Sequence, residues 1–236
     1  MMPVTIDTRI TTTGTSYTVP KLGKTSIKSN GPDLSDLVIP PLRFSVVENK
    51  LYRGSYPRHL NFRFLESLNL KTILSVTPEP LVGEAADWCK ANGVVMLHIK
   101  PQVDGKKGAP LRHTEACQIL SVILEAKNSP LYVHCLNGSE ITGLAMTALR
   151  KVQCWATPSI ISERMRYSET HHSFDRFLEE FSGEVTIPRE CVEWLWAGLR
   201  DDDGLPPLGC GVTINFLDER LGEKHRARIE KAISSR

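Results

Sequence analysis

The order of patterns along this sequence predicts an α/β fold with a central, mainly parallel sheet of four or five strands flanked by helices. Short β-branched runs alternate with helical patterns between residues 71 and 149. Parallel strands need long crossover connections, which helices usually supply, so this alternation favours parallel pairing. In the run 131–149, an apolar β-rich run meets a short loop and then a helix-forming run. This run predicts a loop of backbone N–H groups at the start of a helix, where anions bind.

The other elements follow from the same local signals. Proline and glycine separate the periodic runs, and Thr157-Pro158 has the pattern of an N-cap followed by proline in the first turn. This pattern predicts a helix over 159–167. We also expect a hairpin at 44–47 and 50–53, strands at 71–76 and 94–99, and helices at 61–70, 84–91, 111–127, 172–181 and 188–199.

The two ends of the chain differ in composition from its middle. Residues 1–39 are rich in Ser and Thr and poor in large apolar residues, which predicts a flexible N-terminal tail. We expect the folded domain to span 40–200, and 201–236 to be a linker followed by a charged helix at 216–233. The acidic run 201–203 precedes a glycine, which favours a solvated turn over a metal site.

Composition excludes several functional classes. The formal charge of +2 indicates neither a nucleic-acid surface nor a polybasic membrane anchor, and the longest apolar runs are far shorter than the roughly 20 residues that span a bilayer. The N-terminus shows no signal-peptide core. The six cysteines have no close pairs and no metal-ligand spacing, so we expect no disulfide frame and no metal or other cofactor. A reducing, cytoplasmic location fits this cysteine usage.

The loop in the run 131–149 carries the chemistry-bearing residues. Cys135 ends the expected strand and follows His134, while Thr142 and Gly143 open the expected helix. A cysteine beside converging N–H groups is in the setting that a thiolate nucleophile requires. The backbone groups that could bind a phosphate belong to Asn137, Gly138, Ser139, Glu140, Ile141 and Gly143.

This pattern resembles the signature of cysteine-dependent phosphatases, in which five residues separate His-Cys from an arginine followed by Ser or Thr. With the segments 40–57, 61–65 and 70–80, it makes the chain similar to the plant and fungal atypical dual-specificity phosphatases of the protein-tyrosine-phosphatase superfamily. Within that branch it most resembles the fungal tyrosine-phosphatase-like members of the oxidant-induced cell-cycle-arrest group. The resemblance implies a phosphatase-like fold, a phosphotyrosine protein or inositol pyrophosphate as ligand, and a complex with related phosphatase-like proteins.

The signature breaks at its sixth position. Ile141 stands where the family has the arginine that grips two phosphoryl oxygens, and Glu140 precedes it. Loss of one oxyanion donor typically costs about 100- to 1,000-fold in rate, and a charged fork should cost more. Glu140 either faces the anion site, where it would repel a phosphate, or points to solvent. We therefore expect little or no phosphatase activity.

Other roles are left open by the residues themselves. Cys135 fits the nucleophile position or a buried structural cysteine. Thr142 fits a partner of the thiolate or a cap of the helix. Asp104 is the only carboxylate between residues 100 and 110, so it fits either the general acid of the resemblance or an ordinary turn residue.

Three hypotheses follow. The first is a pseudophosphatase that binds through the retained fold. The second is an active phosphatase in which Arg112, Arg164 or Arg166 replaces the missing arginine. The third, sulfur transfer on a rhodanese-like loop, agrees less well with Thr142-Gly143. The first two differ in whether a guanidinium reaches an anion placed above the Cys135 sulfur.

Overall fold

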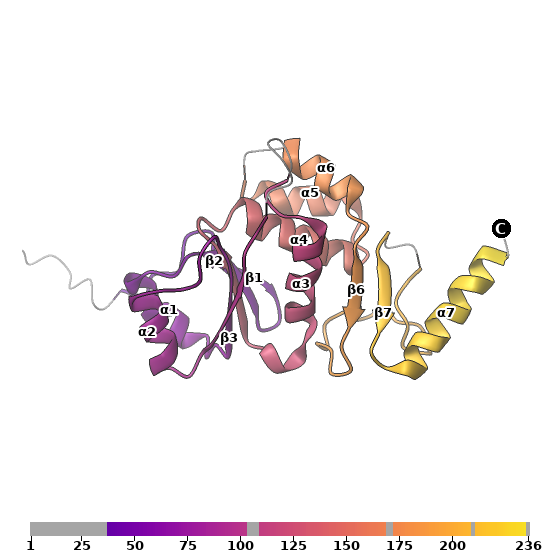
Figure 1. Cartoon of the computed structure of the whole chain (residues 1–236), viewed down its shortest axis with the longest axis horizontal. Helices are drawn as coiled ribbons and strands as arrows, with labels where there is room; N and C mark the ends of the chain where they lie inside the picture. Colours follow the sequence, from indigo (N-terminus) through magenta and orange to yellow (C-terminus); the bar gives the residue numbers. More distant parts are fainter. Residues whose placement is uncertain (1–36, 103–108, 169–171, 209–210, 235–236) are drawn as a thin grey trace, which may run out of the picture. The chain divides into compact units, whose positions relative to one another are not determined.

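A five-stranded sheet in the order β1-β2-β5-β3-β4 is the centre of the unit that runs from Val38 to Arg236 (Figure 1). β5 is the middle strand and pairs in parallel with both neighbours, β3 and β4 are also parallel, and β1 joins β2 as an antiparallel hairpin. The predicted α/β fold with a mainly parallel sheet is confirmed. The strands are β1 (Ser45–Glu48), β2 (Leu51–Ser55), β3 (Thr72–Val76), β4 (Val95–Ile99) and β5 (Leu131–Cys135).

This computed structural model describes residues 37–102, 109–168, 172–208 and 211–234. The chain divides into Met1–Leu37 and Val38–Arg236. The tail expected over 1–39 therefore lies almost entirely outside the described residues.

Helices cover both faces of the sheet, because successive residues of its inner strands point to opposite sides. Ile73 and Tyr132 face α1 and α2 in one apolar cluster. Leu74 and Val133, one residue further on, face α3 and α4 in another cluster, and Figure 1 shows the two helix pairs on opposite sides. The helices are α1 (Phe62–Ser67), α2 (Glu84–Ala91), α3 (His113–Leu124), α4 (Glu140–Val152), α5 (Thr157–Met165), α6 (His172–Glu180) and α7 (Glu219–Ser234).

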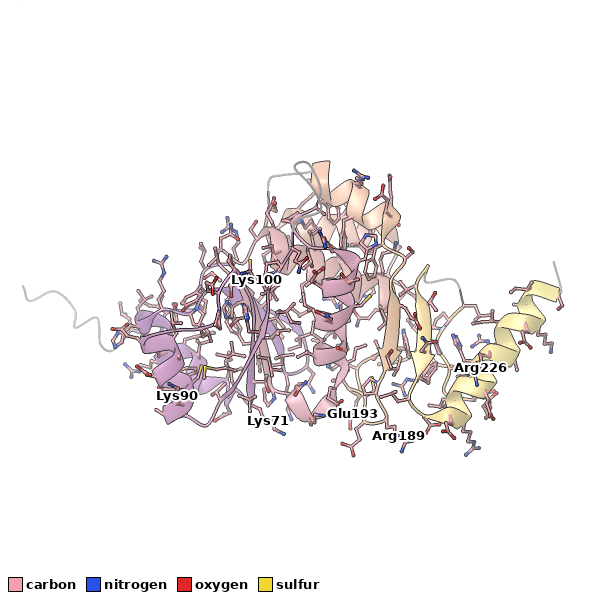
Figure 2. All side chains as sticks on the ribbon, in the orientation of Figure 1. Lys71, Lys90, Lys100, Arg189, Glu193 and Arg226 are labelled. Atoms are coloured by element: carbon pink, nitrogen blue, oxygen red, sulfur yellow. The ribbon has the colours of Figure 1, made fainter. Side chains whose placement is uncertain are left out.

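The direction of the strands places the site at one end of the sheet. Lys71 precedes β3 and Lys100 follows β4, and Figure 2 shows their side chains at opposite ends. Cys135 ends β5 at the same end as Lys100, which is where sites of parallel sheets are found.

One predicted helix is wrong. Residues 188–199 form a series of turns in which Trp196 has a positive φ of 56°. Tertiary hydrogen bonds replace helical ones here: Val192 N–H donates to the Leu124 carbonyl (3.0 Å) and the Trp196 indole N–H donates to the Val152 carbonyl (2.6 Å). The apolar stripe that predicted a helix is thus the buried side of an irregular segment.

A second, two-stranded sheet was missed. β6 (Glu184–Ile187) and β7 (Thr213–Phe216) pair in parallel. Each strand has only four residues, which is too short for a clear alternating pattern. The helix predicted at 216–233 follows as α7 (Glu219–Ser234).

The acidic turn at 201–203 is exposed, and it also anchors α7. Arg228 Nη1 lies 2.8 Å from Asp201 Oδ2 and donates to the Pro206 carbonyl (2.9 Å). Lys224 forms an ion pair with Asp203. The turn that composition predicted to be merely solvated thus holds a helix in place.

Two further findings concern helices. α5 begins at Thr157, with Ala156 in the capping position and no side-chain cap, so the predicted N-cap is wrong by one residue. Pro158 still fits, since proline is tolerated in the first helical turn. Among the described residues, none of the helices has the length and apolar character to cross a bilayer.

Candidate functional site

The candidate site is the turn between the middle strand and α4. β5 is buried over its whole length and ends at Cys135, which is 2% exposed, and α4 begins at Glu140. Gly138 has φ +70°, and a Cβ there would lie 2.6 Å from the backbone of Gly54. Only glycine satisfies both the backbone conformation and this close approach to β2.

Arginines from three parts of the chain bind the carbonyl groups of this turn. Arg43 Nη1 donates to the Asn137 carbonyl (3.1 Å), and Arg53 Nη2 donates to the Gly138 carbonyl (2.7 Å). Arg164 Nη1 donates to the carbonyls of residues 139 and 140 at 3.1 and 2.9 Å. Four consecutive carbonyls are therefore held by guanidinium groups, and we call this set of contacts the carbonyl clamp.

The carbonyl clamp fixes the direction of the backbone donors. In a planar trans peptide, the C=O of one residue and the N–H of the next point in opposite directions. Each N–H group from Gly138 to Ile141 therefore points away from the arginine that holds the preceding carbonyl. Within α4, Gly143 is the first residue whose N–H donates to a helical carbonyl, that of Ser139 (2.8 Å). The N–H groups before it are the ones a helix leaves available for an anion.

The glycine of the Thr142-Gly143 pair has a packing role. A Cβ on Gly143 would lie 1.6 Å from Arg164 Nη1. Glycine is needed at this position because the guanidinium of Arg164 fills the space that any side chain would occupy.

A side chain of the loop itself already uses one of the inward donors. Asn137 Oδ1 accepts a hydrogen bond from the Ser139 N–H (3.0 Å) and from the Cys135 thiol (3.6 Å). An amide oxygen thus lies where the loop offers donors, and an incoming anion would have to replace it.

Thr142 and Ile141 lie side by side at the start of α4. Thr142 is fully buried, and its hydroxyl has no hydrogen-bond partner among the described residues. It is inside the helix, whose N-cap is Ser139, so it does not cap α4. Ile141 is partly buried against the larger apolar cluster, and its side chain offers no donor in place of the family's arginine.

Glu140 turns toward α5. Its carboxylate lies 4.0 Å from Arg164 Nη2 and accepts a hydrogen bond from Ser168 Oγ (3.5 Å). It lines a cavity of about 460 Å³ beside the loop. The other residues that line this cavity are Arg43, Asn137, Ser139, Met165, Arg166, Tyr167 and Ser168.

His134 ties the middle strand to β3. Its Nε2 lies 2.8 Å from Ser75 Oγ, its register partner. Complete burial lowers the pKa of His134 to about 4, so the ring is neutral near pH 7. His134 therefore acts as a neutral hydrogen-bonding group under the site.

The two buried arginines of the carbonyl clamp remain charged. Arg53 is 2% exposed and lies 3.8 Å from the centroid of the Tyr167 ring, and burial lowers its pKa to about 10. Burial also lowers the pKa of Arg164, while Glu140 and Cys135 oppose this effect.

Arg112, Arg166 and Asp104 are the remaining candidates from the sequence. Arg112 donates to Gln102 Oε1 (2.9 Å), and Arg166 lines the cavity beside the loop. Asp104 lies outside the described residues. In the described part of the chain, no three His, Cys, Asp or Glu side chains are grouped so that they could hold a metal ion.

Arg43 and the role of Arg53 were missed by sequence reasoning. One signal was present: Arg53 lies in the middle of a short strand, between Tyr52 and Gly54, where a charged side chain is unusual unless it has a buried partner. For Arg43 the sequence offers no comparable signal, because its φ of 55° and its bond to Asn137 depend on the fold.

A middle parallel strand that ends in a buried cysteine, followed by a glycine turn and a helix start, defines the class of cysteine-loop phosphatase folds. The chain belongs to the tyrosine phosphatase family, whose model matches residues 38–200.

Individual relatives agree with this family. The putative tyrosine-protein phosphatase OCA6 of Saccharomyces cerevisiae is 33% identical, over 84% of this chain and 90% of the relative. The inositol diphosphatase DSP3 of Arabidopsis thaliana is 34% identical, over 66% of this chain and 77% of the relative. The core catalytic domain of the PP-IP phosphatase SIW14 from S. cerevisiae matches with a TM-score of 0.58 and 30% identity, over 62% of this chain and 89% of that structure.

Proposed function

We propose that this chain is a pseudophosphatase, which binds a phosphorylated ligand at the Cys135 loop and does not hydrolyse it at a useful rate. The observation that carries the proposal is Ile141, which stands in the position of the family's phosphate-gripping arginine and packs against the core instead. A planar fork that holds two phosphoryl oxygens has no equivalent in an alkyl side chain.

The carbonyl clamp supports this reading. The guanidinium groups of Arg43, Arg53 and Arg164 each bind backbone carbonyls, so they are used to orient the loop. The N–H groups they orient can still bind an anion, and so can the positive end of α4. Binding without turnover is what such a loop offers.

The names of the relatives suggest the class of ligand that we propose for this chain. Several are named inositol diphosphatases, and the family name refers to tyrosine phosphatases. We propose that the ligand is an inositol pyrophosphate or a phosphotyrosine segment, since both present the phosphate dianion that the loop donors fit.

The test is phosphate release from 5-diphosphoinositol pentakisphosphate and from a phosphotyrosine peptide, measured with the full chain. Wild-type protein should release phosphate no faster than Cys135→Ser. Ile141→Arg should raise the Cys135-dependent rate by about tenfold or more, because it restores two charge-assisted hydrogen bonds. Adding Glu140→His to that variant should raise it further by removing a negative charge.

Binding is measured separately by calorimetry. The wild-type protein should bind the phosphotyrosine peptide and not its unphosphorylated form, or bind the inositol pyrophosphate and not free inositol. Robust turnover by the wild type that Cys135→Ser abolishes would overturn the proposal.

The second candidate is an active phosphatase in which Arg164 takes over the catalytic arginine's role. Its guanidinium adjoins the loop, and its Nε and Nη2 have no hydrogen-bond partner among the described residues. In that case Arg164→Lys would lower kcat far more than it raises KM. Under the pseudophosphatase proposal, the same change alters ligand affinity only.

A further inference from the structure

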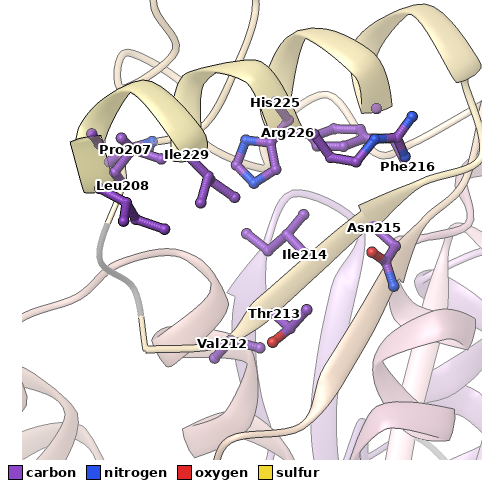
Figure 3. A pocket seen from close by; sticks show the side chains of 13 residues that line it. Pro207, Leu208, Val212, Thr213, Ile214, Asn215, Phe216, His225, Arg226 and Ile229 are labelled. Atoms are coloured by element: carbon purple, nitrogen blue, oxygen red, sulfur yellow. The ribbon is translucent and has the colours of Figure 1, made fainter.

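A second recess lies far along the chain from the Cys135 loop, between β7 and α7. It has a volume of about 670 Å³, larger than the cavity beside the loop. Figure 3 shows α7 along one side and β7 along the other, with Ile214 and Ile229 projecting into the space between them. All the residues that line it follow residue 200, where the family match ends. We call it the β7–α7 groove.

One wall of the β7–α7 groove is an open strand edge. In a strand, alternate residues direct their N–H and C=O groups to opposite edges. The Leu217 N–H donates to the Ile187 carbonyl of β6 (3.0 Å), so residues 213 and 215 also face β6. Ile214 and Phe216 therefore direct their backbone groups to the other edge. In the described part of the chain, β6 is the only strand that pairs with β7.

The other wall is the apolar face of α7. Ile229 and Ile233 line the groove and are 39% and 69% exposed. The ion pairs of Arg228 with Asp201 and of Lys224 with Asp203 connect this helix to the acidic turn. The groove therefore has an apolar wall that faces a row of backbone donors and acceptors.

The charged side chain that lines the groove is positive. Arg226 lines it, and a Cβ added to Gly222 would lie 3.8 Å from Arg226 Nη1 and 3.7 Å from the Phe216 carbonyl oxygen. Among the described lining residues there is no carboxylate. Arg226 thus places a positive charge at the end of the groove next to Phe216.

A buried histidine also lines this space. The His225 side chain is 95% buried, its Nδ1 has no hydrogen-bond partner among the described residues, and Figure 3 shows its ring directed from α7 toward β7. An unpaired buried polar atom is costly unless a ligand satisfies it.

We propose that the β7–α7 groove binds an extended segment of a partner protein, which adds to β7 as a third strand. Backbone hydrogen bonds to Ile214 and Phe216 would hold the segment, and apolar side chains at alternate positions would contact Ile229 and Ile233. An acidic residue of the segment would lie next to Arg226. The partner is thus recognised by an alternating apolar pattern that ends in a negative charge.

The probe is a phage-displayed library of random dodecapeptides, selected on the full-length protein and counter-selected on Ile229→Asp. The enriched sequences should have apolar residues at alternate positions and a nearby Asp or Glu. A labelled synthetic copy of the best sequence should bind at least about tenfold more weakly to Ile229→Asp and to Arg226→Glu, because these changes place a negative charge in the groove.

Matched controls keep the test specific. Leu199→Asp alters an exposed leucine outside the groove, and Arg220→Glu reverses a charge on the same helix that does not line it. Both should bind the peptide within about twofold of wild type. Peptide binding should also slow amide hydrogen exchange at Ile214 and Phe216 and leave the amide of Asn215 unchanged.

Three outcomes would overturn the proposal. They are the absence of any sequence enriched over the counter-selection, a bound peptide that leaves exchange at Ile214 and Phe216 unaltered, and occupation of the groove by a second copy of this chain. The last would appear in sedimentation as a dimer that Ile229→Asp dissociates. None of these outcomes depends on phosphatase activity or on Cys135.

Discussion

The Cys135 loop and the β7–α7 groove both present unpaired backbone donors, but they position them in different ways. In the loop, Arg53 and Arg164 are buried and bind backbone carbonyls. The N–H group in each of these peptide units points the opposite way, into the loop. In the groove, the donors lie along a strand edge, and partly exposed ion pairs with the acidic turn hold α7, the opposite wall. Buried charges are expensive to move and fix one geometry, whereas exposed pairs contribute little and allow adjustment. The loop should therefore be rigid and salt-insensitive, and the groove adjustable.

The largest expected effect is at Gly138. Gly138→Ala should lower the free energy of unfolding by about 3 kcal/mol or more, since it combines a strained φ with a backbone clash against Gly54. Gly204 in the acidic turn also has a positive φ, 79°, but open space around it. Gly204→Ala should cost only about 1 kcal/mol from strain alone. Urea unfolding of the two variants measures the difference, and equal losses would contradict a tightly built loop.

The next effect is a pH dependence centred on His134. Its pKa is about 4 in the folded protein and 6.5 as a reference, because burial disfavours the charged form. Below pH 6.5 the unfolded chain therefore binds more protons at His134 than the folded protein does. The contribution of His134 to the free energy of unfolding is fully present above pH 6.5 and is lost as the pH drops toward 4. The loss should reach roughly 3 kcal/mol. His134→Gln should flatten this part of the unfolding curve measured against pH.

His225 provides the comparison for this prediction. Burial and the nearby Arg228 lower its pKa as well. The sign is the same, so its contribution is also lost as pH falls. We expect His225→Gln to change the pH profile less than His134→Gln, and the reverse order would mean that the groove is the more tightly buried region.

Replacing a glycine by alanine should change the free energy of unfolding in opposite directions in α4 and in α7. Gly143→Ala should destabilise by about 2 kcal/mol, because the new methyl group displaces Arg164 from two carbonyls. Gly222→Ala in α7 meets atoms only at 3.7 Å and beyond, so it should stabilise by about 0.5–1 kcal/mol through helix propensity. Thermal unfolding of both variants tests this contrast.

A double-mutant cycle identifies the cause. With Arg164→Ala in place, Gly143→Ala should no longer cost stability, since the space is then empty. If the cost persists, the clash with Arg164 is not its source.

The smallest expected effect is that of salt. In about 1 M NaCl, amide hydrogen exchange in α7 should speed up by about two- to fivefold, because screening weakens the exposed pairs with Asp201 and Asp203. Exchange in α4 should not change. Equal acceleration in both helices would mean that salt acts on global stability and not on the groove.

The sequence determined the sheet and the place of the Cys135 loop. The strand–loop–helix order around Cys135 predicted a buried strand, a glycine turn and a helix start, and the structure has all three. These features could be predicted from the sequence because they depend on local periodicity and on residues that are close together along the chain. The same reasoning failed over 188–199, where an apolar stripe with helical spacing packs as irregular turns.

The tertiary structure alone decided what the charged residues do. Arg43 and Arg53 lie far from Arg164 in the sequence, and only the folding of the β1–β2 region and α5 around the loop brings the three side chains to four consecutive carbonyls. The acidic turn at 201–203 is exposed, as its composition predicts, but its ion pairs with Arg228 and Lys224 could not be predicted from composition. A local sequence pattern carries no information on such partners, because a hydrogen bond or an ion pair depends on distances that are set only when the whole chain has folded.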